Sequence, residues 1–160
     1  MRLSIPFYIL LFCLLLSTWS CQEKKNADIP STGVTESVGP SYPALGNDVL
    51  NRLYADVEQV DIIFYDLPIS VNQDDAPSAK NTALYISPTN PVIAKTCKPI
   101  ARLSFISKGI ILQDADVYCD TGCQYFVFMK NNTPFAANAM AQGGIDFFNN
   151  ITSQVSKPQQ

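Results

Sequence analysis

The chain of 160 residues contains no histidine. It therefore cannot supply the Ser-His or Cys-His pairs of nucleophilic catalysis, the commonest general base, or the imidazole ligands of most catalytic zinc sites. Charged residues are also few: Lys and Arg number 11, Asp and Glu 14, and the net charge is −3. The absence of a basic stripe argues against a nucleic-acid partner. We expect no cofactor and no metal site.

The composition is 47% hydrophobic and 11% aromatic, which is typical of a folded chain rather than a disordered one. The length leaves room for one small domain. We divide the sequence into a signal peptide (1–20), a cysteine followed by a flexible tether (21–44), a single domain (45–156) and a short tail (157–160).

The first twenty residues have the pattern of an export signal. Arg2 supplies a positive start, Ile5 to Leu16 are almost all apolar, and Ser17 to Ser20 are mainly small. The apolar run is about a dozen residues, whereas a helix that spans a bilayer needs roughly 20. The alternative left open is an uncleaved membrane anchor.

Cys21 stands directly after this segment. Its position resembles the signal of bacterial lipoproteins, in which the cysteine becomes the acylated first residue of the mature chain. The family usually has Leu and a small residue three and two positions before the cysteine, where this chain has Thr18 and Trp19. Residues 21–25 (CQEKK) resemble the charged segment that follows the cysteine in Bacteroidota lipoproteins. The resemblance implies a lipid anchor at Cys21 carrying more than one acyl chain, palmitate among them, which makes anchoring stable. Ordinary signal cleavage remains the alternative.

The tether contains turn-forming and charged residues with little apolar periodicity. Its Pro and Gly residues would interrupt any helix or strand. A flexible chain of about 22 residues has an r.m.s. reach of roughly 25 Å, enough to hold a domain away from a membrane.

Periodicity within the domain predicts helices and strands in an α+β arrangement. We expect an antiparallel meander of about four to five strands that packs in two layers against an N-terminal and a C-terminal helix. The expected helices are 48–58, 76–86 and 141–154, and the expected strands are 60–67, 100–106, 110–119, 123–130 and 135–138.

Two turns set the expected register of the meander. We read 107–109 and 120–122 as three-residue turns, so that Ile106 pairs with Ile110 and Cys119 with Cys123. One face then faces the core: Ala101, Leu103, Phe105, Ile111, Ala115, Val117, Tyr125, Val127 and Met129. On the other face Arg102 falls opposite Asp114, a favourable cross-strand pair.

Three cysteines remain in the domain: Cys97, Cys119 and Cys123. The expected register places all three on one face near one edge. In an oxidising compartment we expect one disulfide that includes Cys97, plus one buried thiol. If the strand 100–106 extends back to Cys97, then Cys97 lies opposite Cys119, which is the favoured partner. If the chain leaves the sheet at Pro99, Cys123 is favoured instead.

Aromatic and charged side chains gather on the face that we expect to lie away from the core. Aromatic residues beside an arginine are typical of protein interfaces. The residues of this expected partner surface are Arg102, Asp114, Asp116, Tyr118, Phe126 and Phe128. The alternative is that another segment covers them.

These features predict an envelope-anchored lipoprotein with a non-catalytic domain that binds a partner or has a structural role. It would reach the membrane through its lipid, bind an envelope protein, and lie at the outer membrane, on the periplasmic side or the cell surface. The alternatives are a small periplasmic inhibitor or ligand carrier, and a hydrolase that uses Asp114 and Asp116 as carboxylates.

Overall fold

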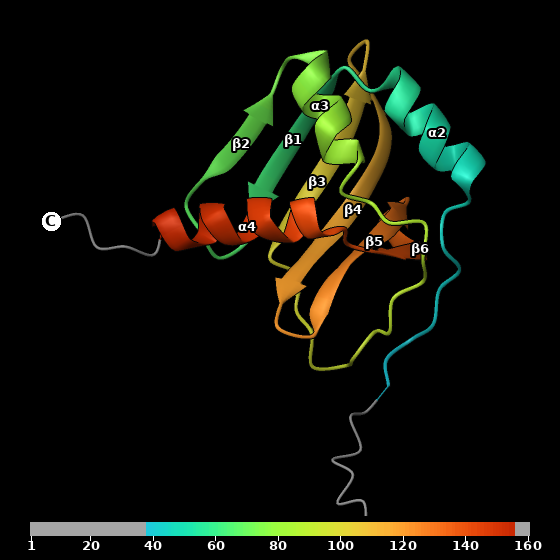
Figure 1. The fold of residues 1–160 in the computed structure, drawn as a ribbon, viewed down its shortest axis with the longest axis vertical. Helices are drawn as coiled ribbons and strands as arrows, with labels where there is room; N and C mark the ends of the chain where they lie inside the picture. The colour runs from blue at the N-terminus through green and yellow to red at the C-terminus, as the bar shows by residue number, and fades with distance from the viewer. Residues whose placement is uncertain (1–37, 156–160) are drawn as a thin grey trace, which may run out of the picture. The chain divides into compact units, whose positions relative to one another are not determined.

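The computed structural model describes residues 38–155, which belong to one compact unit (Figure 1). The signal peptide, Cys21, most of the tether and the tail lie outside the described residues. The elements in chain order are α2 (Asn47–Asp56), β1 (Gln59–Phe64), β2 (Ser70–Gln73), α3 (Ala76–Ala83), β3 (Ala101–Ser107), β4 (Ile110–Asp120), β5 (Cys123–Lys130), β6 (Thr133–Ala139) and α4 (Gln142–Val155).

The described strands form one open antiparallel sheet in the order β2-β1-β3-β4-β5-β6. The α+β class is confirmed, but the sheet has six strands where four to five were expected. The strand that the sequence did not predict is β2, which has four residues and lies at an edge of the sheet. Its polar sequence, SVNQ, gives no apolar alternation, because neither of its faces is fully buried.

All three described helices contribute to a core on one face of the sheet (Figure 1). Helix α2 buries Leu53, and α4 buries Phe148, whose ring meets those of Phe64 and Phe126 edge-on at 6.4 Å. Helix α3 begins at a true N-cap, because the Asp75 carboxylate accepts the N–H of Ser78. We call this the helix face of the sheet.

The β3–β4 hairpin is tighter than expected. Ser107 pairs with Ile110, so the turn contains only Lys108 and Gly109, with φ of 50° and 73°. Positive φ at both positions is what a two-residue turn of this kind requires. The expected pairing of Ile106 with Ile110 is therefore wrong by one residue.

A second irregularity restores the expected face of β4. The register shifts between Phe105 and Ile106, because Leu112 has no partner across the bulge. The two shifts of one residue add up to two, and the side chains of a strand alternate with period two. Consequently Ala115 and Val117 of β4 keep the core face that was expected, while Arg102 pairs with Asp116 instead of Asp114. Ile111 lies before the bulge, pairs with Ile106 and is exposed, so its expected place in the core was wrong.

The β4–β5 hairpin is also one residue tighter, and no bulge compensates before the end of β5. Asp120 pairs with Cys123, and Gly122 takes a φ of 77° in the turn. A shift of one residue moves every side chain of β5 to the opposite face. The helix face thus receives Phe126 and Phe128, while Tyr125, Val127 and Met129, which were expected in the core, turn away from it.

The opposite face of the sheet is partly covered by two segments that lie side by side, residues 38–43 and 91–97, which we call the strap (Figure 1). The N–H of Gly39 donates to the carbonyl of Ile93 at 2.6 Å, and Val38 bridges Ala94. A second apolar cluster lies under the strap: Tyr42, Ile93, Cys97, Tyr118, Cys123, Tyr125, Val127, Met129 and Ala137. We call this side of the sheet the strap face.

One buried polar residue ties the strap-bearing loops to the sheet. The amide of Asn138, on β6, accepts the N–H of Leu45 at 2.8 Å and donates to the carbonyl of Ser87 at 2.9 Å. Asn138 is fully buried, so these bonds satisfy groups that would otherwise cost free energy. Asn138 therefore fixes the chain to β6 at Leu45, just after strap residues 38–43, and at Ser87, just before strap residues 91–97.

Candidate functional site

A disulfide joins Cys97 of the strap to Cys123 of β5, with Cα atoms 5.8 Å apart. The expected disulfide through Cys97 is confirmed, and Cys123 is its partner. The expectation that all three cysteines share one face is wrong. Because the β4–β5 turn holds two residues instead of three, Cys119 and Cys123 project from opposite faces.

Cys119 is a free, half-buried thiol on the helix face. Its Sγ lies 3.9 Å from the carbonyl oxygen of Ile145 and 3.8 Å from Oδ1 of Asn149, both on α4. Burial, together with the charge of Asp120, raises the pKa of this thiol to about 11. Because Cys119 lies on the helix face and Cys123 on the strap face, the sheet separates the free thiol from the disulfide.

Four of the six residues of the expected partner surface lie together on the strap face: Arg102, Asp114, Asp116 and Tyr118. Nε of Arg102 donates to Oδ1 of Asp116 at 2.6 Å, and the hydroxyl of Tyr65 donates to the same oxygen at 2.7 Å. Asp114 has a different partner, because it accepts the hydroxyl of Ser104 at 2.6 Å. The two carboxylates are thus held by separate neighbours.

The other two residues, Phe126 and Phe128, do not belong to this surface, and their assignment was wrong. Both side chains are fully buried in the helix-face core. The error follows from the β4–β5 turn, which inverts the faces of β5. The same inversion brings Tyr125, which was expected in the core, onto the strap face.

Tyrosines dominate the part of the strap face beside the disulfide. The rings of Tyr118 and Tyr125 stack with centroids 4.6 Å apart and planes at 26°. Tyr125 is 1% exposed, and its hydroxyl has no hydrogen-bond partner among residues 38–155. Burial, with a contribution from Tyr118, raises the pKa of Tyr125 to about 12.

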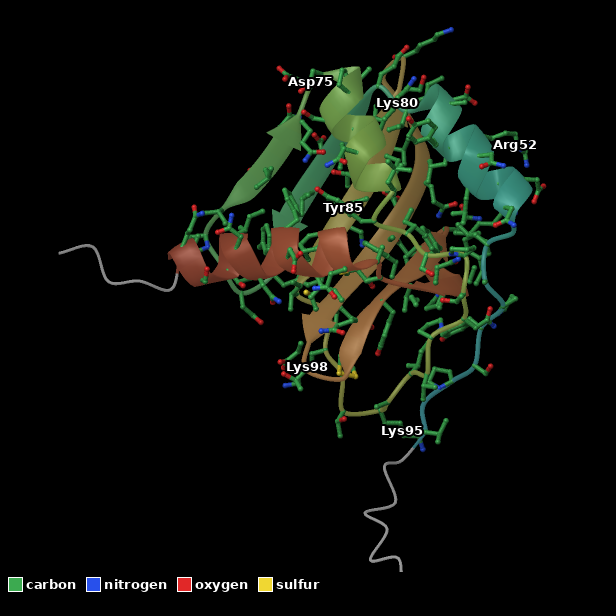
Figure 2. All side chains as sticks on the ribbon, viewed as in Figure 1. Arg52, Asp75, Lys80, Tyr85, Lys95 and Lys98 are labelled. Carbon is green, nitrogen blue, oxygen red and sulfur yellow. A yellow bond between two sulfur atoms is a disulfide. The ribbon has the colours of Figure 1, made fainter. Side chains whose placement is uncertain are left out.

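A pocket of about 240 Å³ lies between the strap and strands β4 to β6. Its wall includes Lys95, an exposed residue that Figure 2 shows near the end of the strap farthest from α2. The pocket is lined by Pro40, Tyr42, Ile93, Ala94, Lys95, Cys97, Asp116, Tyr118, Tyr125, Val127 and Pro134. We call it the tyrosine pocket.

Burial and the charge of Asp116 raise the pKa of the phenols near this pocket above its ordinary value. Burial raises the pKa of Tyr118, and the nearby charge of Asp116 raises it further. Burial also raises the pKa of Tyr65, as does its hydrogen bond to Asp116. These hydroxyls remain neutral at physiological pH and can each donate a hydrogen bond.

Sequence reasoning missed four residues of this region: Tyr42, Tyr65, Lys95 and Tyr125. Tyr42 was assigned to the tether, and Lys95 lies in an irregular segment that carries no periodic signal. The signal that could have found Tyr125 is Gly122, since a glycine with positive φ also suits a two-residue turn.

A second hollow lies on the helix side, at the end of the β3–β4 hairpin. It has a volume of about 600 Å³ between α2, α3 and the hairpin, and its wall includes Lys80 and Glu58. The Glu58 carboxylate accepts the backbone N–H of Lys108 at 2.8 Å. Ile110 and Ile111 project from the hairpin into solvent nearby.

Within the part of the chain that the structure describes, no three Cys, Asp or Glu residues come together as a set of metal ligands. None of the described helices combines the length and the apolarity needed to cross a membrane. Comparison of the chain with protein-family models, with curated proteins and with solved structures finds no match.

Proposed function

We propose that the chain is a lipid-anchored envelope protein whose domain binds a partner, without catalysis, through the strap face of its sheet. The anchor would be Cys21, acylated after signal cleavage, and the location the outer membrane. The sequence pattern of residues 1–25 supports the anchor. The arrangement of the strap face supports the binding role.

The observation that carries the binding role is the cluster of Arg102, Asp116 and Tyr65. These side chains join β3, β4 and the end of β1 across the strap face, where they are partly exposed. The helix-face core does not need them, because that core is built from the alternate residues of the same strands. Arginine and tyrosine held in place beside a carboxylate are residue types that carry binding energy at interfaces.

The anchor is tested by replacing Cys21 with Ser in the full chain and following its fractionation. We expect the variant to leave the membrane fraction or to keep its signal peptide, because serine cannot form the thioether of a lipoprotein. Cys13→Ser, within the apolar run, is the matched control and should behave as the unaltered chain. Unchanged membrane association and unchanged processing of Cys21→Ser would refute lipidation.

The binding role is tested by affinity capture from envelope extract, with quantitative mass spectrometry of what is retained. Arg102→Gln should reduce capture of the specific partner about tenfold or more, as for an interface hot spot. Arg52→Gln is the matched control, since Arg52 makes an exposed ion pair with Asp48 on α2, at the other end of the molecule from Lys95 of the strap (Figure 2). Equal capture by both variants, each folded, would remove the strap face as the binding surface.

One observation favours a ligand carrier as a second candidate. The tyrosine pocket contains a buried hydroxyl without a partner among the described residues, which a small molecule could satisfy. An inhibitor and a carboxylate hydrolase gain no comparable support: Asp114 and Asp116 are hydrogen-bonded to separate partners, Ser104 and Arg102.

A further inference from the structure

We propose that the tyrosine pocket binds a sugar ring, such as one monosaccharide unit of an envelope glycan. This inference rests on the proposed binding role of the strap face and names the class of its ligand. The pocket combines an unpartnered buried hydroxyl, a carboxylate, further phenols and an apolar wall.

The hydroxyl of Tyr125 is the first argument. It is buried and lacks a partner within residues 38–155, and such groups in native proteins call for a specific explanation. A neutral phenol both donates and accepts. The oxygen itself has almost no accessible surface, so a ligand reaches it only when the strap yields slightly. A ligand hydroxyl then satisfies both capacities at once, whereas a simple cation or anion satisfies only one.

Asp116 adds a second requirement. Its Oδ1 is already shared by Arg102 and Tyr65, and no residue of the described chain donates to its Oδ2. Since the carboxylate lines the pocket, the ligand must bring hydrogen-bond donors. Proline-rich peptides, which also dock in aromatic grooves, lack backbone N–H donors at their prolines. Sugar hydroxyls supply donors and acceptors together.

The size and the wall of the pocket suit one ring. A volume of about 240 Å³ lies below the ~300–1,000 Å³ range of pockets for drug-sized ligands. Ile93, Val127 and Pro134 give apolar surface for the C–H face of a sugar, and Val127 lies directly beside Asp116 on the neighbouring strand.

The walls of the pocket are also joined to each other before any ligand arrives. The disulfide from Cys97 to Cys123 joins the strap to its floor, and the bond from Gly39 to Ile93 joins the two halves of the strap. A site fixed in this way loses less conformational entropy when it binds.

The test uses the purified protein labelled with 3-fluorotyrosine, and the ¹⁹F signals of its tyrosines are assigned with single Tyr→Phe variants. The probes are the methyl glycosides of glucose, galactose, mannose and N-acetylglucosamine, with glycerol and a proline-rich peptide for comparison. We expect at least one glycoside to shift the Tyr118 and Tyr125 signals saturably, with a Kd on the order of 1 mM. The signal of Tyr54, on α2, should not move.

Tyr125→Phe then isolates the hydroxyl. This variant should fold with an unchanged or raised melting temperature, because it removes an unsatisfied polar group and keeps the ring. Its affinity for the bound glycoside should fall about tenfold, the effect of one hydrogen bond at the upper end of its usual range. Tyr54→Phe is the matched control and should bind as the unaltered chain does.

The outcomes separate this inference from the proposed function. If no glycoside shifts the two signals, or if Tyr125→Phe binds equally well, the sugar site is refuted, while capture that depends on Arg102 keeps the partner surface. Saturable binding of the peptide alone also refutes the sugar and leaves a peptide partner. Glycoside binding that depends on Tyr125, without any Arg102-dependent capture, establishes the sugar site and refutes the protein partner.

Discussion

On the helix face of the sheet, side chains from three helices close over an apolar core. On the strap face, two extended segments pack against strands β4 to β6, with charged side chains and tyrosines beside them. The same strands supply both faces, since their residues alternate. Phe126 enters the core, and Tyr125 next to it enters the tyrosine pocket. The comparison teaches that one position of register decides whether an aromatic residue packs under the helices or under the strap.

The two faces are also held together differently. The helix face depends on burial of many apolar side chains, which is distributed over the whole core. The strap depends on a few specific bonds, among them the disulfide of Cys97 and the Gly39–Ile93 hydrogen bond. Substitutions should therefore damage the fold on one face and the pocket on the other.

The largest effect is expected from Phe126→Ser combined with Phe128→Ser. Each removes a fully buried aromatic side chain, and such losses cost about 3–5 kcal/mol apiece. Their sum approaches or exceeds the ~5–15 kcal/mol stability of a typical domain, so the double variant should unfold. Thermal unfolding followed by circular dichroism measures this.

The matched control for that experiment is Phe135→Ser on β6. Phe135 is 37% exposed, so its replacement should lower the melting temperature far less than the double change in the core. If the double variant melted like the unaltered chain, β5 would have the opposite facing and the comparison of the two faces would fail.

A smaller effect is expected from breaking the disulfide with Cys97→Ser and Cys123→Ser. The bond closes a loop with a sequence separation of 26, for which chain entropy gives about 3–4 kcal/mol. The domain should remain folded with a lower free energy of unfolding in guanidinium chloride, while the strap loosens and glycoside binding weakens. Cys119→Ser is the control that keeps the disulfide. Full glycoside affinity without the bond would show that the strap holds its position by packing alone.

Much of the fold could be predicted because it depends on local patterns. The apolar periodicity of α2 and α4 and the alternation in β3 and β4 located these elements within a few residues. The edge strand β2 could not be found, since pairing with β1 forms it without help from its own polar sequence. Tertiary pairing overrides local preference in such strands.

The candidate site was predictable only in part, because an even number of one-residue register shifts leaves a side chain on its expected face and an odd number moves it to the other face. Arg102, Asp114, Asp116 and Tyr118 were placed on the correct face because the tight turn at Lys108 and the bulge at Leu112 compensate each other. The turn at Gly122 has no such compensation, so the faces of β5 were exchanged. Turn length and bulges depend on backbone conformation that composition alone does not fix.

The smallest effect on stability is expected at Cys119. Its free thiol lies under α4 on the helix face, so its reactivity reports whether that end of the face is covered. Its pKa is raised from 9.0 to about 11, so at pH 8 alkylation by iodoacetamide should be roughly hundredfold slower than in the unfolded chain, following the thiolate fraction. Because the folded pKa is the higher one, the stabilising contribution of the thiol is complete below pH 9 and is lost as the pH rises towards 11. Relative to Cys119→Ala, the unaltered chain should therefore lose stability over that interval, as urea unfolding at a series of pH values would measure. The control is the same alkylation in denaturant, where the rate should titrate near pH 9. A midpoint near 9 in the folded protein as well would mean that Cys119 faces solvent, and that α4 does not cover this end of the helix face.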